Sequence, residues 1–179
     1  DTDKARSKEV YTKNIIDSLL WLGLRWNSEP QIQSQRVEKH KEIANLLLDN
    51  NHAYKCNCNE KKLEEKRQFI KENNLKIKKI CTTCKDDQSV QKLSSNYVVR
   101  IKIPLDGQTN ITDIVQGNIL VKNKELDDYI ILRKDGTPTY MLSVTVDDHD
   151  LGINYIIRGD DHLNNTFRQK YIYEFMDWK

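Results

Sequence analysis

The sequence predicts an α/β protein in which one open-sheet domain is interrupted by a smaller α+β insertion. Three observations support this fold class: helical periodicity in the first part of the chain, a cysteine-bearing and strand-rich middle, and a helix–strand–helix order near the end. That last order is typical of open α/β sheets that bind nucleotides. We therefore expect residues 1–50 and 135–179 to form the sheet domain and residues 51–134 to form the insertion.

Two amphipathic helices are expected in the first segment. Ser7 can cap a helix over about residues 8–22, and Gly23 is well placed to end it. A second helix is expected to begin at Ser34 and to end at Asn50. Both helices carry apolar residues at helical spacing, so we expect each to bury one face.

The middle segment combines a lysine-rich helix with several strands. The helix is expected over about residues 60–72, before an Asn–Asn turn. Runs of β-branched and aromatic residues predict four strands, of which the second and third would pair as a hairpin. These strands are expected at 97–103, 111–115, 117–121 and 129–133.

The last segment contains the densest group of polar residues beside an apolar run. A helix is expected after Pro138, a strand at 154–157 and a final helix over about residues 163–177. The strand would end at Arg158, directly before two carboxylates and a histidine. Ligands of open α/β sheets bind at the carboxyl ends of the strands, so we expect a binding site there.

Composition limits the class of protein. The 179 residues are 37% hydrophobic and 31% charged, with a net charge of +2, which excludes a uniformly basic nucleic-acid coat. The charge is nevertheless uneven: Glu60–Lys79 holds eight basic and four acidic residues, and Lys124–Asp161 holds nine acidic and four basic residues. This asymmetry favours a polyanion bound at one place and a different ligand at another, and two solvated faces are the alternative. No apolar run approaches the ~18 residues that span a bilayer, so we expect no membrane partner.

Four cysteines fall into two close pairs, Cys56-x-Cys58 and Cys81-x2-Cys84, separated by 22 residues. Two such pairs match the tetrahedral thiolate ligands of a structural Zn²⁺ ion. Reduced cysteines packed as small apolar groups are the alternative, and His40 or His52 could replace a ligand. Free thiols in a lysine-rich chain without an evident leader indicate the reducing cytoplasm.

Three short polar stretches are candidates for ligand binding. In the turn and helix start Asp135–Tyr140 the tyrosine hydroxyl could donate to a carboxylate or phosphate, or the ring could simply lie in the core. The acidic stretch Asp147–Asp150 could bind a metal ion or accept hydrogen bonds from ribose hydroxyls, or it could be a solvated loop. In the terminal stretch, Arg158 can form two parallel hydrogen bonds with a carboxylate or phosphate. Gly159 would let the main chain approach a ligand closely, and residues 164–166 could cap the last helix.

Together these stretches resemble glutamyl-tRNA synthetases, which are class I aminoacyl-tRNA synthetases. The resemblance spans nearly all 179 residues and is most specific in the Ile-Arg-Gly-Asp-Asp-His block. It rests on Asp1-Thr2-Asp3-Lys4-Ala5-Arg6-Ser7, Trp21-Leu22-Gly23-Leu24-Arg25-Trp26, Tyr54-Lys55-Cys56-Asn57-Cys58, Asp135–Tyr140, Val146-Asp147-Asp148 and Ile157–His162. It implies a partial Rossmann-like catalytic domain, interrupted by an inserted α+β subdomain that binds zinc and the tRNA acceptor stem.

The resemblance also implies a reaction and a set of site residues. Glutamate and ATP, the latter with Mg²⁺, would form glutamyl-adenylate, and the 3′ end of tRNA(Glu) would then accept the glutamyl group. The implied assignments are Tyr140 and Arg158 for glutamate, Asp161 and His162 for ATP, Asp3, Asp147 and Asp148 for the tRNA 3′ end, and Cys56, Cys58, Cys81 and Cys84 for zinc. The family's His-x-Gly-His and Lys-Met-Ser-Lys-Ser motifs would lie outside residues 1–179, so we expect these residues alone to be inactive and assign no catalytic residue.

The sequence departs from the family pattern at two places and is compatible with two rival functions. Asp160 stands where the family more often has glutamate, and the second cysteine pair is often replaced in the family by a Cys-x-His type of pair. The rivals are a shortened paralogue that glutamylates a modified tRNA base, and a non-catalytic zinc module that binds RNA. Asp3 argues against glutaminyl-tRNA synthetase, which typically has asparagine there.

Overall fold

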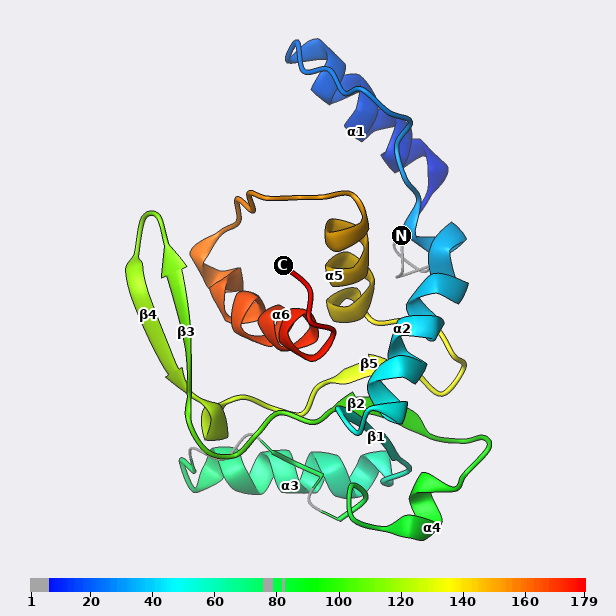
Figure 1. Ribbon diagram of the computed structural model, residues 1–179, viewed down its shortest axis with the longest axis vertical. Coiled ribbons are helices and arrows are strands. Elements are labelled where there is room, and N and C mark those ends of the chain that lie inside the picture. Colours follow the sequence, from blue (N-terminus) through cyan, green and yellow to red (C-terminus); the bar gives the residue numbers. More distant parts are fainter. Residues whose placement is uncertain (1–6, 76–78, 82) are drawn as a thin grey trace.

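The computed structural model describes residues 7–75, 79–81 and 83–179, which form a mixed α/β fold (Figure 1). Its centre is a three-stranded antiparallel sheet with strand order β1-β2-β5. The strands are β1 (Ala53–Cys56), β2 (Val98–Ile101) and β5 (Ile130–Leu132). Helices lie on both sides of this sheet (Figure 1). None of the helices in the described part is long and apolar enough to cross a bilayer.

One face of the sheet packs against three helices and forms the main core. These helices are α2 (Val37–Asp49), α5 (Tyr140–Asp150) and α6 (Leu163–Phe175). The side chains of Leu47, Ile101, Leu142 and Ile172 are fully buried together. One apolar cluster therefore contains residues from all three predicted segments, because the helices of the first and last segments cover strands of the middle segment.

The opposite face of the sheet carries the cysteine-bearing region. Successive side chains of a strand point to opposite faces, so Tyr54 and Cys56 leave β1 on the face away from the main core. They join a second, smaller cluster with Cys81, Cys84 and Val90. Two helices belong to this side, α3 (Glu60–Glu72) and the short α4 (Gln88–Gln91) (Figure 1).

A β-hairpin extends from the sheet beside α6 (Figure 1). It consists of β3 (Gln108–Asp113) and β4 (Gly117–Lys122), paired in register from Gln108↔Lys122 to Asp113↔Gly117. The hydroxyl groups of Thr109 and Tyr171 lie 2.8 Å apart and connect the hairpin to the helix. The expected pairing of two strands in a hairpin is thus confirmed, but the first strand runs over 108–113 instead of 111–115, because residues 114–116 form the turn.

The first helix, α1 (Glu9–Trp21), ends where expected but packs differently. Gly23 has a positive φ of 79°, its N–H donates to Leu20 O, and Leu24 N donates to Leu19 O, which completes the helix end. Ser7 is not the cap, because Lys8 occupies that position without a side-chain hydrogen bond. The expected burial of one face is also wrong: α1 has no buried residue and stands away from the main core (Figure 1).

Other differences have equally simple causes. A 3-10 helix, η1 (Gln33–Arg36), precedes α2, so the α-helix begins after the expected Ser34. Strand β1 was not expected, because its four residues are too few to show alternation. Residues 154–157 form no strand, since no strand of the described chain lies beside them to complete a hydrogen-bond ladder. The Ile157 side chain is accordingly 98% exposed.

Candidate functional site

The structure brings the four cysteines of the sequence together. Their sulfur atoms all lie within 4.8 Å of one another. Cys58 Sγ is 3.5 Å from Cys81 Sγ and 3.3 Å from Cys84 Sγ, and none of the four is in a disulfide. Three of them are buried and Cys58 is half-buried. Four converging thiols at the end of a strand and in a following loop are the donor set that suits tetrahedral Zn²⁺.

The thiols differ in their tendency to ionise. The pKa of Cys81 is lowered to about 4, chiefly by a hydrogen bond with Cys56. The same hydrogen bond, followed by burial, raises the pKa of Cys56. Burial, followed by hydrogen bonds with Cys84 and Cys81, raises the pKa of Cys58 to about 12. Within the cluster, Cys81 is therefore the thiol that ionises most readily.

Tyr140 lies at the first position of α5, directly after a structured turn. Asp135 Oδ1 accepts from Thr137 N at 2.9 Å and from Thr137 Oγ1 at 2.6 Å, and the pKa of Asp135 is lowered chiefly by this side-chain hydrogen bond. Gly136 has a φ of 76°, which a side chain would strain. The Tyr140 side chain is 49% exposed, so it is not a core residue.

The two neighbouring aspartates of α5 have different environments. Asp147 is 6% exposed, and its Oδ1 accepts from Arg36 Nε at 2.7 Å and lies 2.9 Å from His40 Nε2. Burial raises the pKa of Asp148, and the positive charge of Arg158 opposes that rise. The carboxylate of Asp147 is thus occupied by contacts with Arg36 and with His40 of α2, whereas the pKa of Asp148 is set mainly by burial.

Arg158 is the most informative residue of the terminal block. Its side chain is half-buried, and its Nη1 atom is buried without a hydrogen-bond partner in the described residues. Gly159 lets the Asp161 carboxylate lie close to the main chain, because a Cβ atom at position 159 would be only 2.6 Å from Asp161 Oδ1. Buried guanidinium nitrogens are normally satisfied, so this unsatisfied donor indicates a missing acceptor.

Asp161 and His162 lie in a 3-10 helix, η3 (Asp160–His162), at the start of α6. Both side chains are exposed, and His162 Nε2 lies 3.6 Å from Asp161 Oδ2. The expected capping by residues 164–166 is wrong, since His162 occupies the N-cap position of α6 and no side chain caps it. The preceding turn of 3-10 helix satisfies part of the helix start instead.

The structure thus joins some predicted site residues and separates others. The positive charge of Arg158 is near enough to Asp148 to oppose the rise of its pKa, and Tyr140 and Asp147 are on one face of α5, two turns apart. Asp3 lies outside the described residues. The assignment of Tyr140 and Arg158 to glutamate and of Asp161 and His162 to ATP, which the resemblance implies, stays a prediction.

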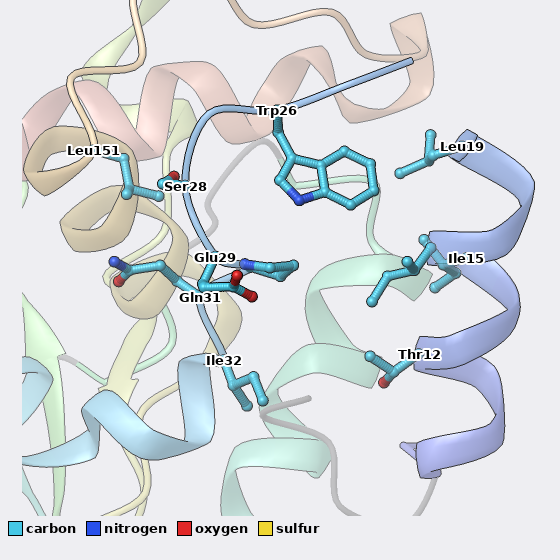
Figure 2. A pocket seen from close by; sticks show the side chains of 11 residues that line it. Thr12, Ile15, Leu19, Trp26, Ser28, Glu29, Gln31, Ile32 and Leu151 are labelled. Carbon is cyan, nitrogen blue, oxygen red and sulfur yellow. The ribbon is translucent and has the colours of Figure 1, made fainter. Parts of the chain in front are cut away.

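Sequence reasoning missed Arg36 and one cavity, and it considered His40 only as an alternative metal ligand, whereas His40 contacts Asp147 and is not part of the cysteine cluster. Arg36 and His40 have the i, i+4 spacing of one helix face, but only their contact with α5 reveals their role. A largely apolar cavity of 380 Å³ lies between α1 and the segment 26–32. Figure 2 shows the Trp26 ring facing Ile15 and Leu19 across this cavity. It contains none of the predicted site residues.

Comparisons with known proteins complete the description. Residues 1–179 match the family described as tRNA synthetases class I (E and Q), catalytic domain. The chain is 44% identical to a glutamate–tRNA ligase of Lawsonia intracellularis, over 100% of the chain and 38% of that protein. It is 46% identical to glutamate–tRNA ligase 1 of Erythrobacter litoralis, over 99% of the chain and 37% of that protein.

A solved structure shares the fold. The chain superposes with a TM-score of 0.83 and 25% identity on a glutamate tRNA ligase from Elizabethkingia meningosepticum, crystallised in complex with its amino acid. The match covers 100% of the chain and 39% of that protein. The chain therefore spans less than half the length of the relatives that it matches.

Proposed function

The chain belongs to the class I tRNA synthetase family for glutamate and glutamine, as part of its catalytic domain, and on that basis we propose that it serves a glutamate–tRNA ligase. The proposed enzyme activates glutamate with ATP and transfers it to the 3′ end of tRNA(Glu). A carboxylate oxygen of glutamate attacks the α-phosphate of ATP, and pyrophosphate leaves. A 3′-terminal ribose hydroxyl of the tRNA then attacks the acyl carbon, and AMP leaves.

One observation supports a substrate with a carboxylate side chain. The half-buried Arg158 has a buried Nη1 without a partner in the described residues, and it stands directly before the exposed polar residues 160–162. A guanidinium pairs with a carboxylate through two parallel hydrogen bonds, and a neutral amide leaves part of its charge uncompensated. We therefore assign Arg158 to the side-chain carboxylate of glutamate.

The remaining assignments follow the same reasoning. The exposed hydroxyl of Tyr140 would contact the amino acid, and Asp161 and His162 would flank the adenosine of Mg²⁺-bound ATP. Asp148 would accept from the tRNA 3′ end, together with Asp3. Asp147 would act there by orienting α5, since its carboxylate is occupied by Arg36 and His40. These groups place and neutralise the reactants, which is how such transfers are mainly catalysed.

The domain division is part of the proposal. Residues 1–50 and 135–179 would belong to a Rossmann-like domain, and residues 51–134 to an inserted subdomain that grips the acceptor stem. Basic side chains on α3 support this role, because phosphate contacts supply most of the affinity for nucleic acid. The five basic residues of this helix are Lys61, Lys62, Lys66, Arg67 and Lys71.

We also propose that the four-cysteine centre holds a structural Zn²⁺ ion. Cys56 and Cys58 at the end of β1 and Cys81 and Cys84 in the following loop fill all four positions, which leaves none for a substrate. The ion would cross-link the two ends of the segment that contains α3. Thiols that stay reduced favour the cytoplasm as the location.

The test is glutamate-dependent exchange of pyrophosphate into ATP by the purified full-length protein, measured with tRNA present, followed by tRNA charging. Exchange and charging are expected with glutamate and not with glutamine or aspartate. A non-catalytic RNA-binding module would bind tRNA without exchange. A tRNA transcribed in vitro carries no modified base, so charging of this transcript would exclude the base-modifying paralogue, and exchange without charging would contradict the proposed acceptor.

A further inference from the structure

A buried polar layer lies directly behind the four-cysteine centre. Tyr54 of β1 pairs with Arg100 of β2, and Cys56 is two residues from Tyr54 on the same strand. Side chains two residues apart, and side chains directly opposite each other, share a face of an antiparallel sheet. Arg100 therefore points toward the cysteines and away from the main apolar core.

Arg100 is an unusual residue for this position. Its side chain is 6% exposed, and its Nη1 donates to the main-chain oxygen of Asp128 at 2.8 Å. Its Nε is buried without a hydrogen-bond partner in the described residues, and the residue stands on the sheet face that also carries Cys56. Leaving a charged donor buried and unsatisfied is costly, so an anion is expected beside it.

The nearby carboxylate does not supply that anion. Asp128 Oδ1 accepts from Lys79 Nζ at 2.8 Å and from Ile103 N at 3.2 Å, and Asp128 Oδ2 accepts from the Tyr54 hydroxyl at 3.3 Å. The carboxylate charge is thus already paired with the buried Lys79 ammonium. The described residues of this layer include two cations, Arg100 and Lys79, and one carboxylate, Asp128, which leaves an excess of positive charge.

A zinc ion with four thiolates carries the opposite excess, a net double negative charge. Resting on the zinc site proposed above, we propose that Arg100 is a positioning residue of this metal centre. Its guanidinium donates a hydrogen bond to the Cys56 thiolate, holds that sulfur toward the ion and offsets the charge of the tetrathiolate. Hydrogen bonds to ligand atoms are known to orient ligands and to tune metal affinity.

The experiment compares the purified full-length protein with Arg100→Met and Arg100→Lys variants. Lys102→Met is the matched control. It also removes one positive charge near β2, but the ammonium of Lys102 is exposed and donates to Asn51. Circular dichroism establishes that each variant is folded. Zinc content, the rate of zinc transfer to a chelating dye and the sulfur-to-cobalt charge-transfer bands of the Co²⁺-substituted proteins are then measured.

We expect Arg100→Met to lose zinc about 10-fold to 100-fold more readily than the unsubstituted protein. Without the hydrogen bond the thiolate donates more strongly, so its cobalt charge-transfer band should move to longer wavelength. A purely structural arginine would not produce that spectral change. Lys102→Met should match the unsubstituted protein in both measurements.

Each other outcome has a definite meaning. Equal zinc retention and an unchanged cobalt spectrum in Arg100→Met would overturn the role of Arg100 and leave the zinc site intact. An unsubstituted protein that contains no zinc and takes up no cobalt would overturn both proposals. If Arg100→Met does not fold, Arg100→Lys decides: it keeps the charge but loses the planar donor group, so a spectrum identical to that of the unsubstituted protein would contradict the proposal.

Discussion

The imidazole Nε2 of His40 lies 2.9 Å from the Oδ1 atom of Asp147, in the buried contact between α2 and α5. Arg36 Nε donates to the same oxygen at 2.7 Å. The pair connects two helices more than a hundred residues apart in the chain, since 107 positions separate its members. It fixes the helix whose first residue is Tyr140 and whose last turn presents Asp148.

Removing this carboxylate is expected to destabilise the protein. Asp147→Asn leaves Arg36 and His40 with a weaker acceptor, so we expect the free energy of unfolding to fall by about 1.5–3 kcal/mol. Urea denaturation at neutral pH measures the change. The control is Glu38→Gln, which breaks the exposed pair with Lys41 and should change stability by less than about 1 kcal/mol. Equal effects of the two substitutions would show that the buried contact is unimportant.

Substitution of Arg158 tests the substrate assignment. We expect Arg158→Gln to lower kcat/KM for glutamate roughly thirtyfold or more, because the substrate carboxylate loses its charged partner. This factor corresponds to a loss of about 2 kcal/mol of transition-state stabilisation. Arg158→Lys should be intermediate, since lysine keeps the charge without the two parallel donors. Arg25→Gln, which alters an exposed arginine after α1, should leave kcat/KM unchanged. Full activity in Arg158→Gln would remove this residue from the glutamate site.

Each cysteine of the metal centre is expected to be required for zinc binding. Cys58→Ser and Cys84→Ser should lose most bound zinc and become more susceptible to proteolysis near α3, because the ion no longer closes that segment. Zinc content and limited proteolysis provide the measurements. His52→Gln should retain zinc, since the His52 ring stacks on Phe175 with ring centroids 4.3 Å apart and is not part of the cysteine cluster. Loss of zinc from His52→Gln would revise the ligand set.

The lowered pKa of Asp135 leads us to expect a specific dependence of stability on acid pH. Hydrogen bonds from the Thr137 hydroxyl and main chain hold its pKa below the ordinary value of 3.8. A carboxyl whose pKa is lower in the folded state stabilises the protein fully above the unfolded pKa, and that contribution is lost as the pH falls through the folded pKa. Asp135→Ala should therefore lower the urea midpoint at pH 7 and reduce the further loss on acidification to about pH 3. A parallel pH profile for the variant would contradict this account.

Basic residues of α3 are expected to contribute to tRNA affinity. The double substitution Lys61→Gln with Lys62→Gln should weaken tRNA binding and should reduce the slope of log K against log salt by about 1 to 2. Lys8→Gln with Lys13→Gln on α1 removes the same charge from an exposed helix and serves as the control. Filter binding over a series of salt concentrations makes the comparison. Equal slopes for the two double variants would place the phosphate contacts elsewhere.

Local features of this protein were predictable from the sequence because they depend on neighbouring residues. The helix over 60–72 was predicted at the bounds of α3, since Asn59 caps its start and Asn74 adopts the positive φ that ends it. The hairpin was predicted because its strands are adjacent and joined by a tight turn. The cysteine spacing predicted a metal centre, because metal geometry restricts which pairs of thiols can meet.

Contacts between distant segments were decided by the tertiary structure alone. The commitment of Asp147 to α2 and the position of Arg100 behind the cysteines depend on strand register and helix packing, which no short pattern contains. The apolar run at 154–157 has the composition of a strand but lies exposed, because a strand forms only where a neighbour completes its hydrogen bonds. By itself the sequence determined the local elements, the family and the pairing of the four cysteines that converge, and the three-dimensional packing determined which charged groups are buried, paired or left available for a ligand.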